Sequence, residues 1–307
     1  MTAYCVSRLL GAALVMLGVL CLVFALLHLV PGDPVEVMLG EHARPADAKA
    51  LRTALGLDLP LHIQFWHFFE GLLRFDLGAS LHSRRPITEI LAQRIPATVA
   101  LAVASMVIAL LIALPMGMVA AMRRDTAVDA GAVSFSVFAA AVPNFVLGPL
   151  LILVFALWLG WLPVSGRDSA FSIVLPAVTL GASLAAVLSR MVRATLIETL
   201  GQDYIRTARA KGLSEAQVVR RHALGNALLP VVTLAGLQLG VLLAGAVITE
   251  KVFDWPGIGL LLVESIQRRD YPVVQACVLL ISSTYVAVNT GLDFVYAWLD
   301  PRIRLVD

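Results

Sequence analysis

The sequence has little charge for its length. Lys, Arg, Asp and Glu make up 14% of the 307 residues and hydrophobic residues 59%, whereas soluble domains carry about 25% charged residues. The formal net charge of +2 gives no bulk attraction to nucleic acid, and we expect no nucleic-acid partner. The cysteines are an odd set of three without C-x-x-C spacing, which argues against a disulfide framework or a zinc site: Cys5, Cys21 and Cys277.

Catalytic and nucleotide-binding motifs are also absent from the sequence. There is no G-x-x-x-x-G-K-[ST] loop to hold ATP phosphates and no H-E-x-x-H metal motif. Ser165 lacks the G-x-S-x-G context of a hydrolase nucleophile, and His62 and His67 are five residues apart, so they do not share a helix face. We therefore expect no catalytic residue, no metal ligand and no cofactor in this chain.

What the sequence does contain is long uncharged apolar runs separated by charged segments. A helix needs about 20 apolar residues to cross a bilayer, and backbone groups in lipid must be paired within the segment, so spans of this kind are helices. The pattern predicts an all-α integral membrane protein with six transmembrane helices, at Leu9 to Val30, Pro96 to Met122, within Ala130 to Gly166 (ending near Trp161), Ser172 to Ser189, Ala223 to Thr249 and Tyr271 to Leu292.

The first run has a second interpretation, a cleaved signal peptide, because Arg8 precedes it. The run is longer than a usual signal core and no A-x-A site follows, so a retained helix is favoured. Loop charges predict the orientation. With the N-terminus inside, twelve basic residues fall in the inner segments and four in the short outer loops, the four being Arg167, Lys251, Arg268 and Arg269. Both termini are therefore expected in the cytoplasm.

The organisation along the chain follows from these spans. Residues 1–30 form the N-terminal segment and first helix, 31–95 an external region, and 96–307 the membrane core. Within the external region, Leu61 to Arg74 predicts a helix with one apolar face on the membrane or on a neighbouring helix. Pro86 then opens a further helical stretch, since proline is tolerated in a first turn. We expect a small external cap rather than an independent domain.

The inner loop between the fourth and fifth runs, about residues 190–225, is long and highly charged. Asp203 to Lys211 has an acid near its start and bases near its end, which suits a helix dipole. Gly212 is the usual left-handed stop, and Ser214 with Gln217 forms a capping box that starts another helix. The loop therefore predicts a helix, a glycine turn and a second helix.

Two interpretations of this loop remain open. A basic juxtamembrane segment obeys the positive-inside rule and binds anionic lipid, which explains its charge. It does not explain a capped hairpin of about 30 residues, because connections have a median length of about 4–6. The alternative is an ordered docking element for a cytoplasmic partner.

The residues from Asp203 to Ser214, DYIRTARAKGLS, resemble the EAA loop of bacterial ABC importer permeases, and in particular its dipeptide/oligopeptide/nickel branch. In the general pattern, Glu-Ala-Ala is followed by three residues and a glycine, then nine residues and Ile-x-Leu-Pro. Arg206, Thr207 and Ala208 stand at the first three positions and Gly212 at the glycine. The Glu and the Pro are missing, as is typical of the peptide branch, where a proline comes later, here Pro230.

The resemblance extends over nearly the whole chain. Further segments that are similar to the family occur in order and at plausible spacing: LVPGDP at 29–34, LGLDLPL at 55–61, FDLGAS at 75–80, FDWPGIG at 253–259, RDYPVVQ at 269–275 and LDPRIR at 299–304. The chain is thus identified as similar to the first permease subunit of a pair in that branch.

The resemblance implies a type I ABC importer architecture in the bacterial inner membrane, with di- or oligopeptides as cargo, or else nickel, glutathione or another small solute. It implies a second homologous permease subunit, giving a heterodimer, two P-loop ATPase subunits that supply ATP and Mg²⁺, an external solute-binding protein, and contact with membrane lipid. It assigns ATPase coupling to Tyr204, Arg206, Thr207, Ala208, Arg209, Lys211, Gly212, Leu213 and Ser214. Gly212 would let the two helices turn, and Ala208 would permit close approach.

Polar residues inside the apolar runs are the candidates for a translocation path, namely Asn144, Gln238, Ser283 and Asn289. Interhelical hydrogen bonding is the alternative role for them. An ATP-independent transporter or channel should have buried ionisable residues, and the sequence places Glu250 and Asp293 only at helix edges. An intramembrane enzyme would need a nucleophile and a base, for which the sequence offers no pair.

Overall fold

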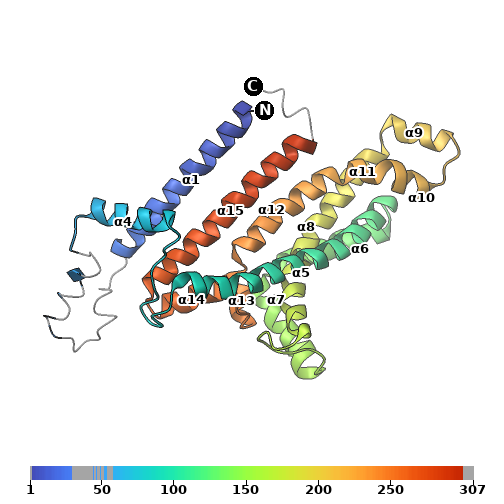
Figure 1. The fold of residues 1–307 in the computed structure, drawn as a ribbon. Helices are drawn as coiled ribbons and strands as arrows, with labels where there is room; N and C mark the ends of the chain where they lie inside the picture. The colour runs from blue at the N-terminus through green and yellow to red at the C-terminus, as the bar shows by residue number, and fades with distance from the viewer. Residues whose placement is uncertain are drawn as a thin grey trace. The chain divides into compact units, whose positions relative to one another are not determined.

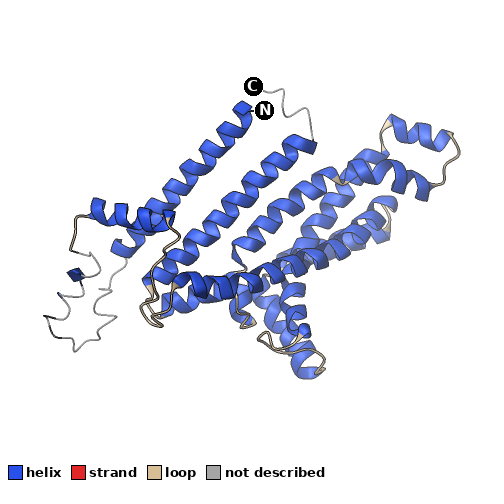
Figure 2. Ribbon diagram, in the orientation of Figure 1, coloured by secondary structure: helices blue, strands red, loops and turns tan. Residues whose placement is uncertain are grey.

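The computed structural model describes residues 2–29 and 58–299, with five isolated positions between them (44, 46, 49, 52 and 53). Throughout the described residues the regular elements are helices (Figure 2). An isolated β-bridge among these residues joins Ala79 to Pro86. The matches to the family at 30–34, 55–57 and 300–304 lie outside the described residues. The chain divides into two compact units, residues 1–98 with 256–290, and residues 99–255 with 291–307.

The first unit contains α1 (Thr2–Leu29), α4 (Leu61–Leu73), the start of α5 (Ile87–Met122), α14 (Ile258–Gln267) and most of α15 (Tyr271–Leu299) (Figure 1). Its α4 is the helix expected at Leu61 to Arg74. Phe65, Phe68, Phe69 and Leu72 of α4 pack against Leu20 and Val23 of α1 and Leu279 of α15. The helix therefore uses its aromatic side chains to cover two membrane helices.

Polar contacts fix the loop before α5 in this unit. Asp270 is buried, and its carboxylate accepts hydrogen bonds from the Ser80 hydroxyl at 2.5 Å and the Leu81 N–H at 3.1 Å. The Thr98 hydroxyl accepts the N–H of Ile258, the first residue of α14, at 2.8 Å. As expected, Pro86 precedes a helix, but α5 runs from Ile87 to Met122 without a break, so the predicted second span is only its later part.

The second unit contains the rest of α5, α6 (Ala127–Ala141), α7 (Asn144–Leu151), α8 (Val174–Leu200) and the helices that follow it to α13. A π-helical segment, Ile152–Trp158, continues α7. After α8 come α9 (Asp203–Ala210), α10 (Glu215–Val218), a second π-helical segment (Val219–Ala223), α11 (Leu224–Ala227), α12 (Leu229–Gly245) and α13 (Val247–Val252). In Figure 1, α9 and α10 stand at one end of this unit.

Glycines allow α5 and α8 to cross closely in the second unit. A Cβ on Gly117 of α5 would lie 2.6 Å from the Ser189 carbonyl oxygen and 2.6 Å from the Val192 Cβ of α8. Reciprocally, a Cβ on Gly181 of α8 would lie 2.9 Å from Ile108 Cγ2 of α5. Backbones that approach this closely gain van der Waals contact, which is the main attraction between helices in lipid.

The predicted spans agree with the structure in number, with corrections to their form. Four helices are long and apolar enough to cross a membrane, and two bent pairs bring the number to six if each pair is one span. The third span is broken at Pro143, where Ala127–Ala141 and Asn144–Trp158 meet at 99°, and the fifth bends by 49°. The fourth continues as α8 to Leu200, beyond the predicted end at Ser189.

Candidate functional site

The predicted inner hairpin is formed by α9, a turn at Gly212, and α10. Gly212 has φ +80°, the left-handed conformation that glycine adopts without strain, so the predicted stop is confirmed. The Ser214 N–H donates to Gln217 Oε1 at 3.1 Å, completing the predicted capping box. Local signals thus determine both ends of the turn.

One face of the hairpin is buried in its own unit. Ile205, Ala208 and Val218 pack in a cluster with Leu196 of α8 and Ala121 of α5. Leu213 packs against the same cluster. Ala208, for which we expected close approach, is only 6% exposed and packs within this cluster.

The opposite face is polar and exposed. Arg209 forms a bidentate ion pair with Glu215 across the turn, with Nε–Oε1 and Nη2–Oε2 distances of 2.7 and 3.2 Å. The hydrogen bond from Arg209 to Glu215 raises the pKa of the guanidinium. Arg206 pairs with Asp203 at 3.4 Å. Five other predicted coupling residues are also exposed: Tyr204, Thr207, Lys211, Gly212 and Ser214. Tyr204 Oη accepts a hydrogen bond from Asn226 Nδ2.

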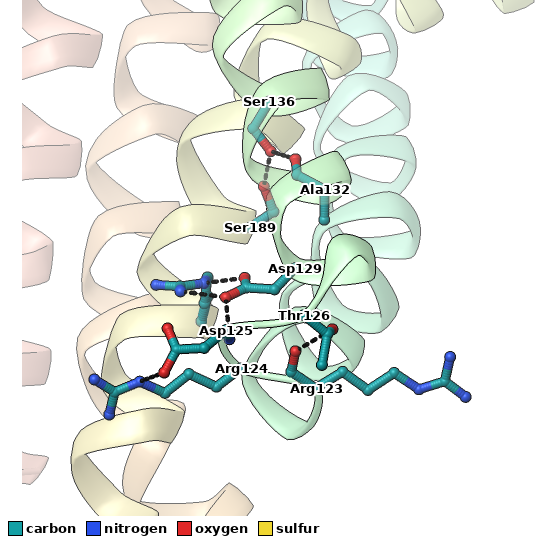
Figure 3. A network of polar contacts seen from close by, with 9 residues as sticks. Arg123, Arg124, Asp125, Thr126, Asp129, Ala132, Ser136 and Ser189 are labelled. Carbon is teal, nitrogen blue, oxygen red and sulfur yellow. Dashed lines mark hydrogen bonds and ion pairs between the residues drawn. The ribbon is translucent and has the colours of Figure 1, made fainter.

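An ion pair joins α8, the helix that precedes the hairpin, to α6. Arg193, two turns before the end of α8, donates from Nε and Nη2 to the two carboxylate oxygens of Asp129 at 2.5 and 2.6 Å. The Asp129 side chain is 5% exposed and that of Arg193 27%. Asp129 also accepts the N–H of Asp125 at 3.0 Å, which holds the turn before α6 (Figure 3).

Farther along the same two helices, the hydroxyls of Ser136 on α6 and Ser189 on α8 lie 3.0 Å apart (Figure 3). Helix α6 is therefore joined to α8 at two levels by polar contacts. The sequence pattern does not reveal this arrangement, because its charges assign Arg193 to a loop and its third apolar run begins just after Asp129.

Two of the four predicted path residues, Asn144 and Gln238, line one cavity of about 510 Å³ in the second unit. Its walls come from α7, α8, α12, Ala246 and the first turn of α13. The lining residues are Asn144, Phe145, Leu180, Ser183, Leu184, Gln238, Val241, Leu242, Ala246, Val247, Ile248 and Thr249. The side-chain oxygen Oδ1 of Asn144 is buried and has no hydrogen-bond partner among the described residues. The cavity is mostly apolar with a few polar groups, as small-molecule sites are.

The other two path candidates are on α15, in the first unit. Ser283 donates to the Leu280 carbonyl at 3.0 Å and Asn289 donates to the Tyr285 carbonyl at 3.0 Å, so both side chains bond to their own helix. Glu250 differs from its expected place at a helix edge: it lies within α13 and is completely buried.

Comparison with known proteins places the chain in a family. The profile described as "Binding-protein-dependent transport system inner membrane component" matches residues 113–305. A second profile, the N-terminal part of such membrane components, matches residues 1–102. The two matches together cover nearly the whole chain, including the hairpin and the cavity.

Curated relatives match over the full length. The glutathione transport system permease proteins GsiC of Escherichia coli (strain K12) and Salmonella typhimurium are each 45% identical over 304 residues, covering 99% of both chains. That of Pectobacterium atrosepticum is 46% identical over the same span.

Solved structures share the fold at lower identity. An amino acid ABC transporter with histidines matches with a TM-score of 0.53 and 16% identity, over 70% of this chain and 94% of that one. The MetNI methionine ABC transporter in an inward-facing conformation matches with a TM-score of 0.53 and 21% identity, over 68% and 97%. These matches do not support the alternative that the chain is an ATP-independent transporter or channel. The chain belongs to the inner-membrane permease components of binding-protein-dependent ABC importers, in the dipeptide, oligopeptide, nickel and glutathione group, whose ATP hydrolysis takes place in separate ATPase subunits.

Proposed function

We propose that this permease imports small peptides of the glutathione kind. The observation that carries the proposal is the 45% identity, over 99% of both chains, to permeases named for glutathione transport. Glutathione is itself a tripeptide, so this cargo is a special case of the di- and oligopeptide class that the sequence pattern suggested. Nickel is the rival cargo from a different chemical class.

The hairpin of α9 and α10 is proposed as the element that docks on an ATPase subunit. Its support is the separation of its two faces: Ile205 and Val218 hold it rigidly on its own unit, while Arg206, Arg209 and Lys211 are exposed. Exposed guanidinium and ammonium groups suit acidic side chains in a partner groove. With the hairpin in the cytoplasm, both termini lie in the cytoplasm too, in keeping with the loop charges.

In this proposal a second, homologous permease chain completes the path, as a heterodimer, and an external solute-binding protein delivers the cargo. ATP binding in the ATPase pair displaces the hairpin, and α8 carries the displacement because it is one helix from the cavity wall at Ser183 to the buried Leu196 beneath the hairpin. Helix α6 moves with α8 through the pair Asp129–Arg193.

The cargo is tested with the complete transporter, purified with its second permease, ATPases and binding protein and reconstituted in proteoliposomes. Uptake of radiolabelled glutathione, of a dipeptide and of Ni²⁺ is measured with and without ATP. The expected result is ATP-dependent uptake of glutathione. Ni²⁺ uptake without peptide uptake would contradict the proposal.

The docking role is tested at the turn. Proline cannot adopt the φ of +80° found at Gly212, so Gly212→Pro should disrupt the hairpin and remove ATPase subunits from the purified complex. Gly225→Ala is the matched control, because Gly225 lies in helix α11 and a Cβ there meets no atom within 4 Å. Full ATPase retention and transport by Gly212→Pro would refute the docking role.

A further inference from the structure

Helix α4 has more apolar surface than the rest of its unit covers. Phe65 and Leu72 pack against α1 and α15, whereas Trp66 and Leu73 are exposed. The two exposed residues are seven positions apart, which is two helical turns, so they lie on the same side of α4. The centre of the Trp66 ring is 5.8 Å from that of Phe69, which packs with the covered residues. The exposed apolar edge is therefore continuous with the covered face.

Polar side chains of α4 lie on the other edge of the helix. Gln64 and His67 are three positions apart, so they are neighbours on one side, and Gln64 Nε2 donates to the Leu59 carbonyl at 2.7 Å. Glu70 follows both Trp66 and His67 by about one turn and pairs with Arg74 at 2.6 Å, in an exposed ion pair. An amphipathic helix with aromatic residues on its apolar side is the form that lies in a membrane interface.

The residues that α4 contacts determine its depth. The apolar part of α1 ends at Ala25 and that of α15 begins at Tyr271. Helix α4 packs against Leu20 and Val23 of α1 and Leu279 of α15. With a rise of about 1.5 Å per residue, these contacts lie about 3–12 Å inside the ends of the two apolar segments, measured along the helices. Interfacial helices bury their apolar face about 5–10 Å below the headgroups, so the depth of α4 fits.

The two spans that α4 covers are aligned at this level. The side chain of Gln275 on α15 donates from Nε2 to the Val23 carbonyl of α1 at 3.0 Å. Leu22 of α1 is exposed at the same level, so the surface that α1 presents to lipid reaches α4. Figure 1 shows α4 lying across the end of α1 rather than along it. The long axis of α4 is therefore close to the plane of the membrane.

The C-terminal end of α4 adds a further exposed aromatic residue. The Asp76 N–H donates to the Gly71 carbonyl at 2.9 Å and the Phe75 N–H to the Leu72 carbonyl at 3.1 Å, the two hydrogen bonds of a Schellman motif. The left-handed position of this motif is usually glycine, but here it is Phe75, with φ +58° and 85% of its surface exposed. A bulky side chain is strained in this conformation. Contact of the ring with an apolar phase offsets that strain, whereas exposure to water does not.

We propose that α4 is an interfacial anchor, whose Trp66, Leu73 and Phe75 insert among the phospholipids of the leaflet at the C-terminal end of α1. By the loop charges this is the external leaflet. The sequence left two places for the apolar face of this helix, the membrane or a neighbouring helix, and in the proposal it occupies both. Gln64 and His67 then face water.

The test measures the surroundings of single spin labels on the complete transporter in vesicles of phosphatidylethanolamine and phosphatidylglycerol, with Cys5, Cys21 and Cys277 replaced by alanine. Leu73→Cys and Phe75→Cys carry the label on the apolar edge, and His67→Cys is the matched control on the polar edge. Paramagnetic resonance reports collisions with O₂, which dissolves in acyl chains, and with a nickel chelate, which stays in water. The ratio of O₂ to nickel collisions should be severalfold higher at 73 and 75 than at 67, with or without the binding protein.

The inference is overturned if the labels at 73 and 75 meet the nickel chelate as often as the label at 67, the result for a helix in water. Labels that are mobile on the purified chain but immobilised in the complete transporter would show that the second permease covers this edge. Protection from nickel that appears only when the binding protein is added would assign the edge to that protein. Either of these results also overturns the proposal.

Discussion

The close crossing of α5 and α8 predicts that alanine substitution at three glycines in helices changes stability by graded amounts. In a helix interior, Gly→Ala is favourable by about 1 kcal/mol through backbone propensity alone. At Gly131 of α6 a Cβ meets no atom within 4 Å, so Gly131→Ala should show this gain in full. It is the control for the other two positions.

At Gly117 the added Cβ would lie 2.6 Å from both the Ser189 oxygen and the Val192 Cβ, and backbone cannot move aside as a flexible side chain can. Overpacking of this kind costs about 1–3 kcal/mol. The propensity gain offsets about 1 kcal/mol of that, so Gly117→Ala should lose up to about 2 kcal/mol. At Gly181 the nearest atoms are at 2.9 and 3.0 Å, and the two effects should nearly cancel.

The assay is equilibrium unfolding of the purified chain in mixed detergent micelles with increasing SDS, followed by tryptophan fluorescence. The expected order of stability is Gly131→Ala, then Gly181→Ala, then Gly117→Ala. If Gly117→Ala unfolds together with Gly131→Ala, the helices do not approach as closely as the structure has them. Transport by the reconstituted complex should decrease in the same order, since α8 links the cavity to the hairpin.

Four further substitutions test polar and packing contacts. Asp129→Asn should lower the unfolding midpoint more than Glu215→Gln does. The ion pair between Asp129 and Arg193 is mostly buried, whereas the pair between Glu215 and Arg209 is exposed, and exposed ion pairs contribute little to stability. Equal midpoints for the two variants would contradict this. Gly236→Ala places a Cβ against the end of the Leu292 side chain and should reduce stability, and Leu292→Ala should restore part of the loss in a double-mutant cycle. A loss that Leu292→Ala leaves unchanged would place the strain elsewhere.

The parts of the structure that follow from local signals were predictable from the sequence. The long apolar runs predicted the number of spans, and Gly212 with Ser214 and Gln217 predicted the hairpin turn, because each signal acts within a few residues. The end of α8 was not predictable in the same way. Charge alone assigns Arg193 to a loop. In the structure it lies within α8 and pairs with Asp129, 64 positions away in the chain, and a contact between such distant residues cannot be predicted from local sequence.

The four candidate path residues show the same limit of prediction from sequence. Asn144, Gln238, Ser283 and Asn289 are equivalent as polar residues in apolar runs, yet only the first two line the cavity. Ser283 and Asn289 bond to carbonyls one turn back in α15, which a helix offers to any such side chain. Which polar groups find partners depends on contacts between helices that are distant in sequence.

In the second unit a single helix, α8, extends from the cavity to the hairpin, the two sites that the proposed coupling connects. Ser183 lies at the cavity and Leu196 beneath the hairpin, thirteen residues apart on α8, a distance of about 20 Å along the axis. A continuous helix transmits a displacement over that length with little bending, whereas the spans on the other side of the cavity are broken at Pro143 and near Leu228. The cavity is thus bounded on one side by a continuous helix that extends to the hairpin, and on the other by spans that are bent. In the proposed coupling, movement of the hairpin would therefore change the shape of the cavity instead of shifting it as a whole, as alternating exposure of the proposed cargo requires.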